Sequence, residues 1–595
     1  MRKLLRFLKG YRFPSIIAPL FKVMEALFEL IIPLVVAKII DVGIPNGDTA
    51  YIWKMGIIMI SLGAAGLAFS VTCQYLAARA STGFGTNVRS ALYRHINKFG
   101  YPEMDKFGAP SLTTRLTNDV NQTQVAVAMF IRLVLRAPFI AIGAIIMAIT
   151  ISPVLSLIFA SMSVIVSVVL YFIMSRSAPI YITIQSKLDN VALLTRENLS
   201  GARVVRAFSR QDEEEEDFAE ASESLARSSK KVGAIAALLN PLTYAIVNLA
   251  VIAVIWFGGI KVENGVLSQG EILALVNYLS QILLSLIVLA NLIVTFTKAT
   301  ACAKRINEVF ETEPSVKDES TGRIEEVAKA PKFEFKNVSF SYGENLAHSL
   351  ENVSVSLSPG ETLGIIGSTG SGKSTLINLL CRFYDVSSGE VLLGGVNVKE
   401  YPFSQLREKI GLVPQQTSLF AGTLRENMQM GDESISDEKI RDALKTAQAY
   451  EFVEKLGGGL DFAVLRDGRN FSGGQRQRLT IARALARSPE ILILDDSSSA
   501  LDYATDFRLR KALKEDTQGL TVVIVSQRYS SIKNADKILV LDDGKVAGIG
   551  THESLLSSCE VYKEICSSQD DNKNTTTAKS NPQYSKDSKK GGKKQ

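Results

Sequence analysis

A glycine-rich run near the middle of the chain carries the residue types that bind phosphate groups. It reads Gly367-Ser-Thr-Gly-Ser-Gly-Lys-Ser374, and it lies between an apolar stretch, residues 363–366, and a helical stretch, residues 375–381. In that setting the backbone amides of the loop wrap phosphates at the positive end of a helix. Lys373 is expected to reach the β- and γ-phosphates, and the Ser374 hydroxyl to coordinate Mg²⁺. The run therefore predicts binding of a nucleoside triphosphate with Mg²⁺.

Four further motifs and one aromatic residue accompany this run. They are Phe471-Ser-Gly-Gly-Gln475, Ile491-Leu-Ile-Leu-Asp495, Ser499-Ala-Leu-Asp502, Val413-Pro-Gln415 and Tyr342. They resemble motifs of the ATP-binding-cassette (ABC) proteins. Residues 471–475 resemble the signature, with Phe471 where Leu is usual, and residues 491–495 resemble the Walker B strand. Residues 499–502 resemble the D-loop, residues 413–415 the Q-loop, and Tyr342 the aromatic residue that stacks on adenine. Residues 196–208 also resemble the second coupling segment of exporter-type half-transporters in this family. The resemblance extends from the first apolar segment to about Leu556.

The resemblance implies that two cassettes sandwich two ATP molecules, each bound by the P-loop of one cassette and the signature of the other. Asp495 would then hold Mg²⁺ together with Ser374 and Gln415, and Gln415 would also sense the γ-phosphate. Asp496, Gln527 and Gln415 occupy the positions that take part in hydrolysis. The residues implied to contact ATP are Tyr342, Gly367, Ser368, Thr369, Gly370, Ser371, Gly372, Lys373, Ser374, Thr375, Gln415, Ser472, Gly473, Gly474, Gln475 and Asp502.

Two positions depart from the family pattern, and both bear on hydrolysis. The residue after the Walker B aspartate is usually Glu, which polarises the attacking water, whereas this chain has Asp496. The shorter carboxylate is expected to end ~1.5 Å from where the water needs it, and a misplacement of about 1 Å can cost ~10²-fold in rate. Gln527 replaces the family's switch histidine; it can hydrogen-bond the γ-phosphate but cannot carry a positive charge. Asp496 alone would also fit a slow but working site, and the two changes together favour an impaired one.

The signature, in contrast, keeps its Ser, both Gly and its Gln. A chain with a weakened P-loop side and an intact signature complements a chain with the reverse arrangement. The sequence therefore predicts a heterodimer with a second, different ABC half-transporter, whose P-loop would form the hydrolysing site against residues 471–475 of this chain.

The first half of the chain contains long stretches without charge. Residues 137–175 include no Asp, Glu, Lys or Arg, which is about twice the ~20 residues that one membrane span needs, and Ser152-Pro153 lies near the middle. This stretch predicts a hairpin of two helices. Residues 13–42, 55–78, 232–260 and 272–297 supply four more spans. The fold class predicted is a six-span α-helical transmembrane domain of ABC exporter type, fused to an α/β P-loop nucleotide-binding domain.

The distribution of Lys and Arg predicts the orientation in the membrane. The long segments 79–106 and 176–231 are basic, whereas the short loops 43–51, 152–153 and 262–270 contain no Lys or Arg. Basic loops stay on the cytoplasmic side, so both termini are expected in the cytoplasm of a multi-pass protein of the cell membrane.

The predicted domain layout follows from these changes in composition. Residues 1–12 form an amphipathic N-terminal helix, 13–312 the transmembrane domain with long cytoplasmic helical extensions, 313–331 a linker, 332–566 the nucleotide-binding domain and 567–595 a disordered basic tail. Within 332–566, short β-rich runs alternate with helical stretches, which predicts a largely parallel sheet.

Charge and cysteine content exclude two other classes of function. The net charge is +6, and the lysines after Gln569 account for that excess, so binding to nucleic acid is not expected. The five cysteines lack ligand-type spacing, which argues against a thiol metal site or a disulfide framework.

Three ionisable residues in the first span bear on the cargo. Lys22, Glu25 and Glu29 share one helix face, and charges inside a membrane usually face the bundle interior and mark a pathway. A local Lys22–Glu25 pair near the headgroups is an equal alternative, and Arg132 and Arg136 are expected to snorkel. The favoured cargo is a small amphipathic molecule, as in multidrug exporters. A lipid or peptide exporter, and an ATP-gated channel or sensor, remain as alternatives.

Overall fold

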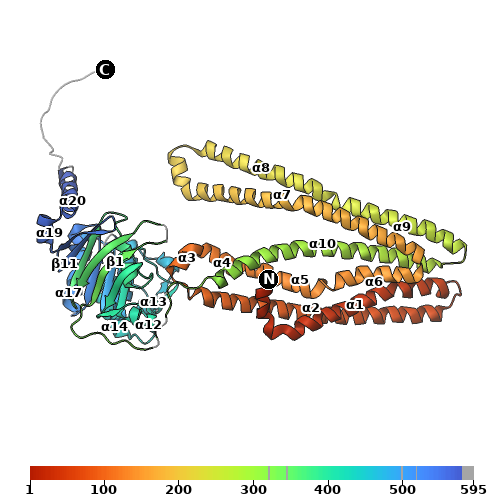
Figure 1. Ribbon diagram of the computed structural model, residues 1–595, viewed down its shortest axis with the longest axis horizontal. Coiled ribbons are helices and arrows are strands. Elements are labelled where there is room, and N and C mark those ends of the chain that lie inside the picture. The colour runs from red at the N-terminus through yellow and green to blue at the C-terminus, as the bar shows by residue number, and fades with distance from the viewer. Residues whose placement is uncertain (319, 321, 344–345, 498–499, 518, 579–595) are drawn as a thin grey trace, which may run out of the picture. The chain divides into compact units, whose positions relative to one another are not determined.

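The computed structural model describes residues 1–595 except 319, 321, 344–345, 498–499, 518 and 579–595 (Figure 1). Its internal contacts divide the chain into two compact units. The helical unit comprises Met1–Lys98 and Phe107–Glu313, and the α/β unit comprises Phe99–Lys106 and Pro314–Gln595. A short segment of the first half of the sequence, Phe99–Lys106, therefore belongs to the α/β unit.

The helical unit consists of long helices that pack along one another, with α1 against α2 and α7 against α8 and α9 (Figure 1). Its elements are η1 (Arg2–Tyr11), α1 (Arg12–Lys38), η2 (Ile39–Gly43), α2 (Thr49–Ile96), α4 (Ala109–Thr114), η3 (Arg115–Asp119), α5 (Val120–Leu133), α6 (Arg136–Ile151), α7 (Pro153–Ala207), α8 (Gln211–Ala237), α9 (Leu239–Glu263) and α10 (Gln269–Glu311). The predicted hairpin is confirmed, because α6 ends at Ile151 and α7 begins at Pro153.

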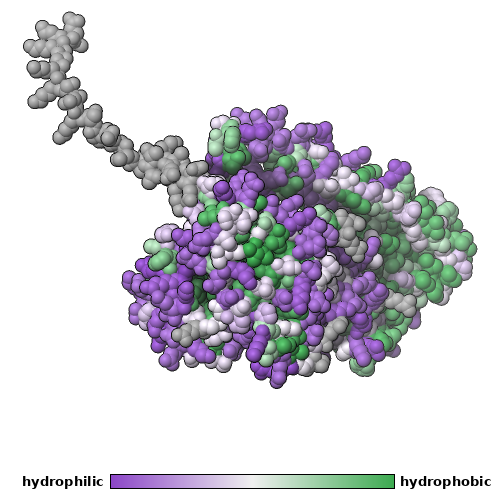
Figure 2. Space-filling model, turned by 60° about the vertical axis from the view of Figure 1, so that its left-hand side comes forward, coloured by the Kyte–Doolittle hydropathy of each residue, from purple (hydrophilic) through white to green (hydrophobic). Residues whose placement is uncertain are grey.

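Five helical stretches in the described chain are long and apolar enough to cross a membrane. They are Thr49–Ile96, Ala109–Ile151, Pro153–Ala207, Gln211–Glu263 and Gln269–Glu311. The sixth predicted span is α1, which differs because Lys22, Glu25 and Glu29 interrupt its apolar sequence. Large apolar side chains are exposed on these helices, for example Ile60 on α2 and Val168 on α7, and hydrophobic surface gathers over this unit in the space-filling view (Figure 2). Such surface is what lipid covers in a membrane protein.

Polar contacts fix α1 against α10 inside this unit. The Asp41 carboxylate accepts hydrogen bonds from the Ser268 hydroxyl (2.5 Å) and the Gly270 backbone N–H (2.7 Å) at the start of α10. Gly270 is required there, because a Cβ would lie 2.4 Å from the Ala37 carbonyl oxygen. The buried Tyr278 hydroxyl donates to the Leu30 carbonyl at 2.7 Å. These hydrogen bonds satisfy polar groups where the helices meet, as close packing in an apolar surrounding requires.

The α/β unit contains a mixed six-stranded sheet and a four-stranded antiparallel sheet. The six-stranded sheet has the order β12-β11-β3-β10-β9-β6, and β11, β3, β10, β9 and β6 are parallel, which confirms the predicted parallel sheet. These strands are β3 (Thr362–Gly367), β6 (Ile410–Val413), β9 (Ile491–Asp495), β10 (Thr521–Val525), β11 (Lys537–Asp542) and β12 (Lys545–Gly550). The second sheet contains β1 (Phe333–Phe340), β2 (Leu350–Leu357), β4 (Ser388–Leu393) and β5 (Val396–Asn397), and β7 (Gly422–Thr423) pairs with β8 (Ala463–Val464).

The α/β unit also contains helices, the first of which, α3, ends one residue inside the helical unit. They are α3 (Tyr101–Phe107), α11 (Lys373–Leu380), α12 (Phe403–Lys409), α13 (Leu424–Met428), α14 (Asp437–Thr446), α15 (Tyr450–Glu454), η4 (Gly459–Asp461), η5 (Arg466–Gly468), α16 (Gly473–Ala486), α17 (Tyr503–Asp516), α18 (Tyr529–Ile532), α19 (His552–Ser558) and α20 (Glu560–Ala578). The predicted disordered tail begins at residue 567, whereas α20 continues helically to Ala578. The rest of that tail, residues 579–595, lies outside the described residues.

Candidate functional site

The glycine-rich run forms a tight loop between β3 and α11. Gly370 and Gly372 have φ angles of +87° and +96°, which side chains with a Cβ rarely adopt. Gly367 allows a close approach of the chain, because a Cβ there would lie 2.1 Å from the Leu541 carbonyl oxygen. The loop thus leaves room at the start of a helix, where backbone N–H groups and the helix dipole favour an anion.

Lys373 lies folded against this loop. Its Nζ donates to the carbonyl oxygens of Gly367 (2.9 Å) and Ser368 (2.5 Å) and to the Ser371 hydroxyl (3.3 Å). Burial lowers the pKa of Lys373, although Asp495 and Asp496 act in the opposite direction. The Ser374 side chain next to it is exposed. An ammonium held only by neutral oxygens can be recruited by phosphates, so the loop fits the predicted role.

The parallel strands bring most of the predicted site residues to one edge of the sheet. Neighbouring strands are in register at their carboxyl ends. The paired residues there are Leu541–Gly367, Ile365–Val525, Val525–Asp495 and Leu494–Val413. The P-loop follows β3, Gln527 follows β10, Asp495 ends β9 and Gln415 follows β6. Carboxyl ends of parallel strands are where ligands bind in α/β folds. Register and strand order therefore explain why residues far apart in sequence meet there.

Two acidic residues stand side by side at this edge. Burial raises the pKa of Asp495, and the neighbouring Asp496 raises it further. Burial also raises the pKa of Asp496, against the effects of Arg528 and Lys373. Asp496 has a φ of +45°, and its backbone N–H donates to the Val525 carbonyl at 3.0 Å. Two half-buried carboxylates with raised pKa values lie next to each other here, and a divalent cation would stabilise their charged forms.

Gln527, the predicted switch residue, begins the segment after β10. Its side chain is exposed. The segment is fixed on both sides, because the Ser526 N–H donates to the Ile365 carbonyl (3.1 Å) and the Arg528 N–H donates to the Ser526 hydroxyl (3.0 Å). The backbone is thus held in place, and the exposed Gln527 side chain can meet a ligand.

Tyr342 has one ring edge fixed and half of its surface open. Its hydroxyl lies 3.1 Å from the Thr375 hydroxyl, and 47% of its surface is exposed. The ring meets Phe340 and Tyr384 edge to face, at centroid distances of 4.9 and 5.2 Å. An aromatic ring with a free surface close to the P-loop helix can stack on an adenine base.

Tyr384 connects this aromatic group to the short segment Phe99–Lys106. The Tyr384 hydroxyl donates to the Asp105 carboxylate at 2.6 Å, and Tyr101 stacks on Phe383 with centroids 4.5 Å apart. Burial raises the pKa of Tyr384, and the hydrogen bond with Asp105 raises it further. The sequence analysis missed this link. The adjacent aromatic residues after the P-loop helix, together with the helix break at Gly100, were the signal that could have found it.

The signature residues lie on a different element, the start of α16. Ser472 is the N-cap: its hydroxyl accepts from the Gln475 N–H (3.3 Å), and the Gln475 side chain accepts from the Ser472 N–H (2.9 Å). Among the described residues, none of these hydrogen bonds goes to the P-loop of the same chain. Phe471 is buried and packs edge to face on Phe462, with centroids 5.8 Å apart, which explains why an aromatic residue is accepted there. The hydroxyl and the N-terminal amides of α16 can therefore meet an anion brought by another chain.

The remaining predicted residues fall into three places. Asp502 caps α17 by accepting from the Thr505 N–H (2.9 Å) and hydroxyl (2.8 Å), and these bonds lower its pKa. Ser499 lies outside the described residues. Residues 196–208 form the end of α7, where apolar Leu199 and Phe208 are 73% and 75% exposed.

The three ionisable residues of α1, Lys22, Glu25 and Glu29, all take part in ion pairs. Lys22 donates to Glu25 at 2.5 Å and to the Ser70 hydroxyl at 3.2 Å, so the local Lys22–Glu25 pair is confirmed. Arg136 donates to Glu29 at 2.7 Å. Arg136 therefore has a carboxylate partner on α1 that the sequence analysis did not foresee, and its snorkelling stays a prediction. Glu29 is neutralised within the chain and is not a free acidic group.

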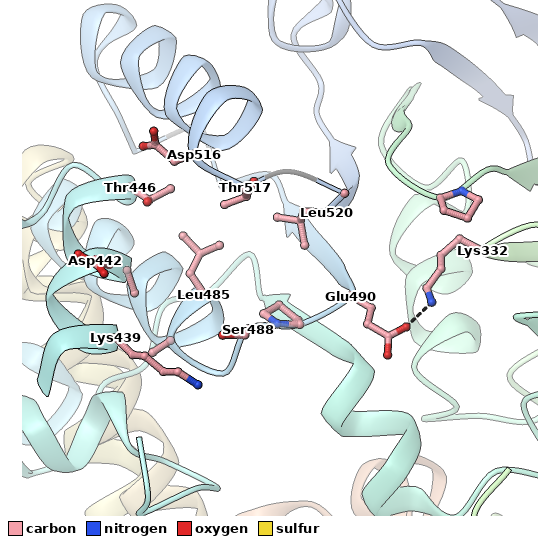
Figure 3. A pocket seen from close by; sticks show the side chains of 15 residues that line it. Lys332, Lys439, Asp442, Thr446, Leu485, Ser488, Glu490, Asp516, Thr517 and Leu520 are labelled. Atoms are coloured by element: carbon pink, nitrogen blue, oxygen red, sulfur yellow. Dashed lines mark hydrogen bonds and ion pairs between the residues drawn. The ribbon is translucent and has the colours of Figure 1, made fainter. Parts of the chain in front are cut away.

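A further cavity of the α/β unit lies apart from these residues. It measures about 620 Å³ and is lined by Lys332, Lys439, Leu485, Glu490 and Leu520 among others (Figure 3). Glu490 and Leu520 directly precede β9 and β10, so the cavity lies at the amino ends of these strands. The P-loop is at their carboxyl ends. The cavity is therefore distinct from the candidate nucleotide site.

The residues present fit ATP with Mg²⁺. The glycine cradle, the exposed Ser374 hydroxyl, the Asp495 carboxylate and Gln415 offer oxygen ligands of the kind Mg²⁺ prefers when it is shared with phosphates. Bound nucleotide would place its phosphates against Lys373 and its base against Tyr342. Mg²⁺ at Asp495 would also offset the electrostatic repulsion between the neighbouring Asp495 and Asp496 carboxylates.

Comparison with known proteins agrees with this arrangement. A family described as the ABC transporter transmembrane region matches residues 15–286, and a family described as ABC transporter matches residues 350–499. An uncharacterized ABC transporter ATP-binding protein of Mycobacterium tuberculosis is 37% identical, covering 94% of this chain and 97% of the relative. An ATP-dependent lipid A-core flippase of Hahella chejuensis is 32% identical, covering 82% and 84%. The solved structure of a bacterial Atm1-family ABC exporter with ATP bound has the same fold, with a TM-score of 0.75 at 23% identity and coverage of 95% and 98%.

Proposed function

The chain belongs to the ABC transporter family, and from this premise we propose that it is the weakly hydrolysing half of a heterodimeric exporter of small amphipathic molecules. Its transmembrane region and its cassette share one polypeptide. ATP binding and transport across a membrane follow from the family. The proposal adds the impaired site, the different partner and the class of cargo.

The observation that carries the proposal is the pair Asp496 and Gln527 at the carboxyl edge of the sheet. Both residues stand beside the P-loop, where the family places its catalytic Glu and its switch His. The shorter carboxylate lies further from an attacking water, and a neutral amide provides no positive charge for the γ-phosphate. ATP would be held here through Tyr342, Lys373 and Ser374 and cleaved slowly.

The intact signature supports the second half of the proposal. Ser472 and Gln475 form a complete capping box, so the N-terminus of α16 is ordered and its hydroxyl is exposed. The partner's P-loop facing this signature would make the hydrolysing site. The exposed apolar end of α7, with Leu199 and Phe208, supplies a surface that a second chain can cover.

The class of cargo rests on the helical unit. Its long apolar helices with few charges suit an amphipathic molecule that enters from the bilayer. One observation favours lipid as a second candidate: Glu29 is paired with Arg136, so α1 offers no free carboxylate for a cationic drug. Both termini and the long extensions of α2 and α7 are assigned to the cytoplasm of the cell, by the charge distribution of the loops.

The experiment that tests the proposal compares the chain alone with the assembled pair. The purified chain alone is expected to bind ATP and to hydrolyse it slowly, and addition of the partner half should raise turnover. Ser472→Ala in the pair should reduce turnover by about 10²-fold, because it removes a hydrogen bond made to the γ-phosphate during hydrolysis. Ser557→Ala, at an exposed serine on α19, is the matched control. Brisk hydrolysis by the chain alone, or unchanged turnover with Ser472→Ala, would refute the proposal.

The same pair distinguishes an exporter from an ATP-gated channel or sensor. An exporter moves labelled amphipathic compound into inside-out vesicles against its gradient, and the compound stimulates ATP hydrolysis. Only downhill flux, with hydrolysis insensitive to the compound, would support a channel.

A further inference from the structure

The C-terminal helix α20 contacts the switch segment next to the P-loop site. The Gln569 side chain donates through Nε2 to the Gln527 carbonyl at 2.7 Å. It also accepts, through Oε1, a hydrogen bond of 3.1 Å from the Tyr529 N–H. One side chain thus holds the backbone on both sides of Arg528. Sequence reasoning did not assign any role to Gln569.

The chemistry of this contact requires an amide. Gln527 offers a carbonyl that needs a donor, and Tyr529 offers an N–H that needs an acceptor, so the orientation of the Gln569 amide is defined by its two partners. Tyr529 is also the first residue of α18, whose N–H has no partner within its own helix. Gln569 therefore acts as a side-chain cap for that helix.

Packing holds α20 in the place that this contact needs. Tyr562 is fully buried in a cluster with Ile366, Ile532 and Val540, on β3, α18 and β11. The Tyr562 hydroxyl lies 2.8 Å from His552 Nδ1, and the His552 ring stacks on Tyr529 with centroids 6.2 Å apart. Helices α18, α19 and α20 thus form one packed group, and Gln569 is fixed relative to the switch segment.

We propose that Gln569 is a positioning residue that holds Gln527 toward the γ-phosphate of ATP bound at this chain's own P-loop. The proposal rests on the proposed function, in which this site retains ATP rather than cleaving it. Gln527 is neutral and cannot gain a charge interaction, so its contribution depends on geometry alone. A fixed backbone at Gln527 preserves that geometry. The C-terminal helix is thereby part of the nucleotide site, although it lies beyond residues 350–499 matched by the cassette family.

The test uses the full-length chain alone, since P-loop, switch segment and α20 all belong to it. Affinities for ATP and ADP with Mg²⁺ are measured by competition with a fluorescent nucleotide. Gln569→Leu should weaken ATP by about two- to tenfold, the range of one hydrogen bond, and leave ADP unchanged. The Tyr529 backbone amide should exchange faster with deuterium. Gln569→Glu keeps an acceptor but loses the donor, so its ATP affinity should fall between wild type and Gln569→Leu.

Ser568→Ala is the matched control, because its hydroxyl donates only within α20, to the Ile565 carbonyl at 3.1 Å. It should leave both affinities unchanged. The proposal would be overturned if Gln569→Leu left the ratio of ATP affinity to ADP affinity unchanged, either because neither affinity falls or because both fall equally. The measurement depends on binding by one chain, so it stands apart from hydrolysis by the pair, which tests the proposed function.

Discussion

At the residue scale, the proposed slow hydrolysis at this P-loop site rests on two side chains. Asp496 is a methylene shorter than the Glu usual in the family, and Gln527 lacks the charge of the switch His. The strand before Asp496 pairs with β10 in regular register, and the Asp496 N–H donates to the Val525 carbonyl at 3.0 Å. The proposed impairment therefore depends on these two side chains, and substitution of both should reverse it.

The double variant Asp496→Glu with Gln527→His should restore hydrolysis at this site. Placing the carboxylate where Glu would put it is expected to raise the hydrolysis rate by up to ~10²-fold. The double variant should hydrolyse ATP faster than either single variant. Single-turnover hydrolysis by the full-length chain with its partner half measures this. Asp496→Asn with Gln527→His serves as the control, since it has the His without the carboxylate. A double variant no faster than this control would show that the two positions do not limit hydrolysis.

The raised pKa values of Asp495 and Asp496 predict how stability depends on pH. Their folded pKa values lie above the unfolded value of 3.8, so their contribution to stability is complete below 3.8 and is lost as pH rises through the folded pKa. At pH 7 without nucleotide, Asp495→Asn should therefore unfold at a higher temperature than wild type, and the difference should shrink toward pH 4.

The same variant should lose protection by Mg²⁺ and ATP. Wild type should gain about 2.7 kcal/mol of stability at a ligand concentration of 100 times Kd, and Asp495→Asn much less. Scanning calorimetry with and without Mg²⁺-ATP measures both effects. Equal protection of the two proteins would exclude Asp495 from the metal site.

At the element scale, contacts connect the segment Phe99–Lys106 to the residues expected to bind the adenine base. Through these contacts, nucleotide binding can affect a segment outside the core of the cassette. It is anchored to the α/β unit by Asp105 on Tyr384 and by Glu103, which accepts from the Ser315 N–H at 3.0 Å. Tyr384 in turn touches the ring of Tyr342. A change at the adenine platform therefore has a short route to a segment whose two ends continue into helical elements.

Tyr384→Phe should weaken this route without affecting nucleotide binding. The variant keeps the ring against Tyr342 and loses the hydrogen bond to Asp105, whose residue is exposed, so water can solvate the carboxylate that the phenol leaves. We expect wild-type ATP affinity and loss of stimulation of ATP hydrolysis by transported compound. Tyr401→Phe, at a buried tyrosine that bonds the Leu393 carbonyl, controls for loss of a tyrosine hydroxyl. Preserved stimulation in Tyr384→Phe would exclude the route.

Much of the fold could be predicted from the sequence because local signals were strong. The hairpin break at Ser152-Pro153 and the apolar runs of β3, β9 and β10 depend on residues close in the chain. Other contacts join residues far apart in sequence. They are the ion pair of Arg136 with Glu29, the hydrogen bond of Tyr384 to Asp105 and the hydrogen bond of Gln569 to the Gln527 carbonyl. No periodicity or motif announces such contacts, because each depends on how distant elements pack. The site was therefore predictable where a motif defines it, and its supporting contacts were not.

At the scale of the whole molecule, the proposal makes the chain one member of a pair with divided tasks. In it, this chain's own site retains ATP and its signature serves the site of the partner. If the partner's P-loop site carries out most of the hydrolysis, loss of the carboxylate of Asp496 should have little effect on turnover. A chain with a conventional active site would behave in the opposite way.

The most direct test is steady-state ATP hydrolysis by the assembled pair with Asp496→Asn. The account predicts that hydrolysis falls by no more than about twofold, because a barrier change of that size is under 1 kcal/mol and the partner's site still works. Nucleotide binding to the variant, measured in parallel, should match wild type. A fall of hydrolysis to background would show that Asp496 is the catalytic base of the pair and would contradict the account.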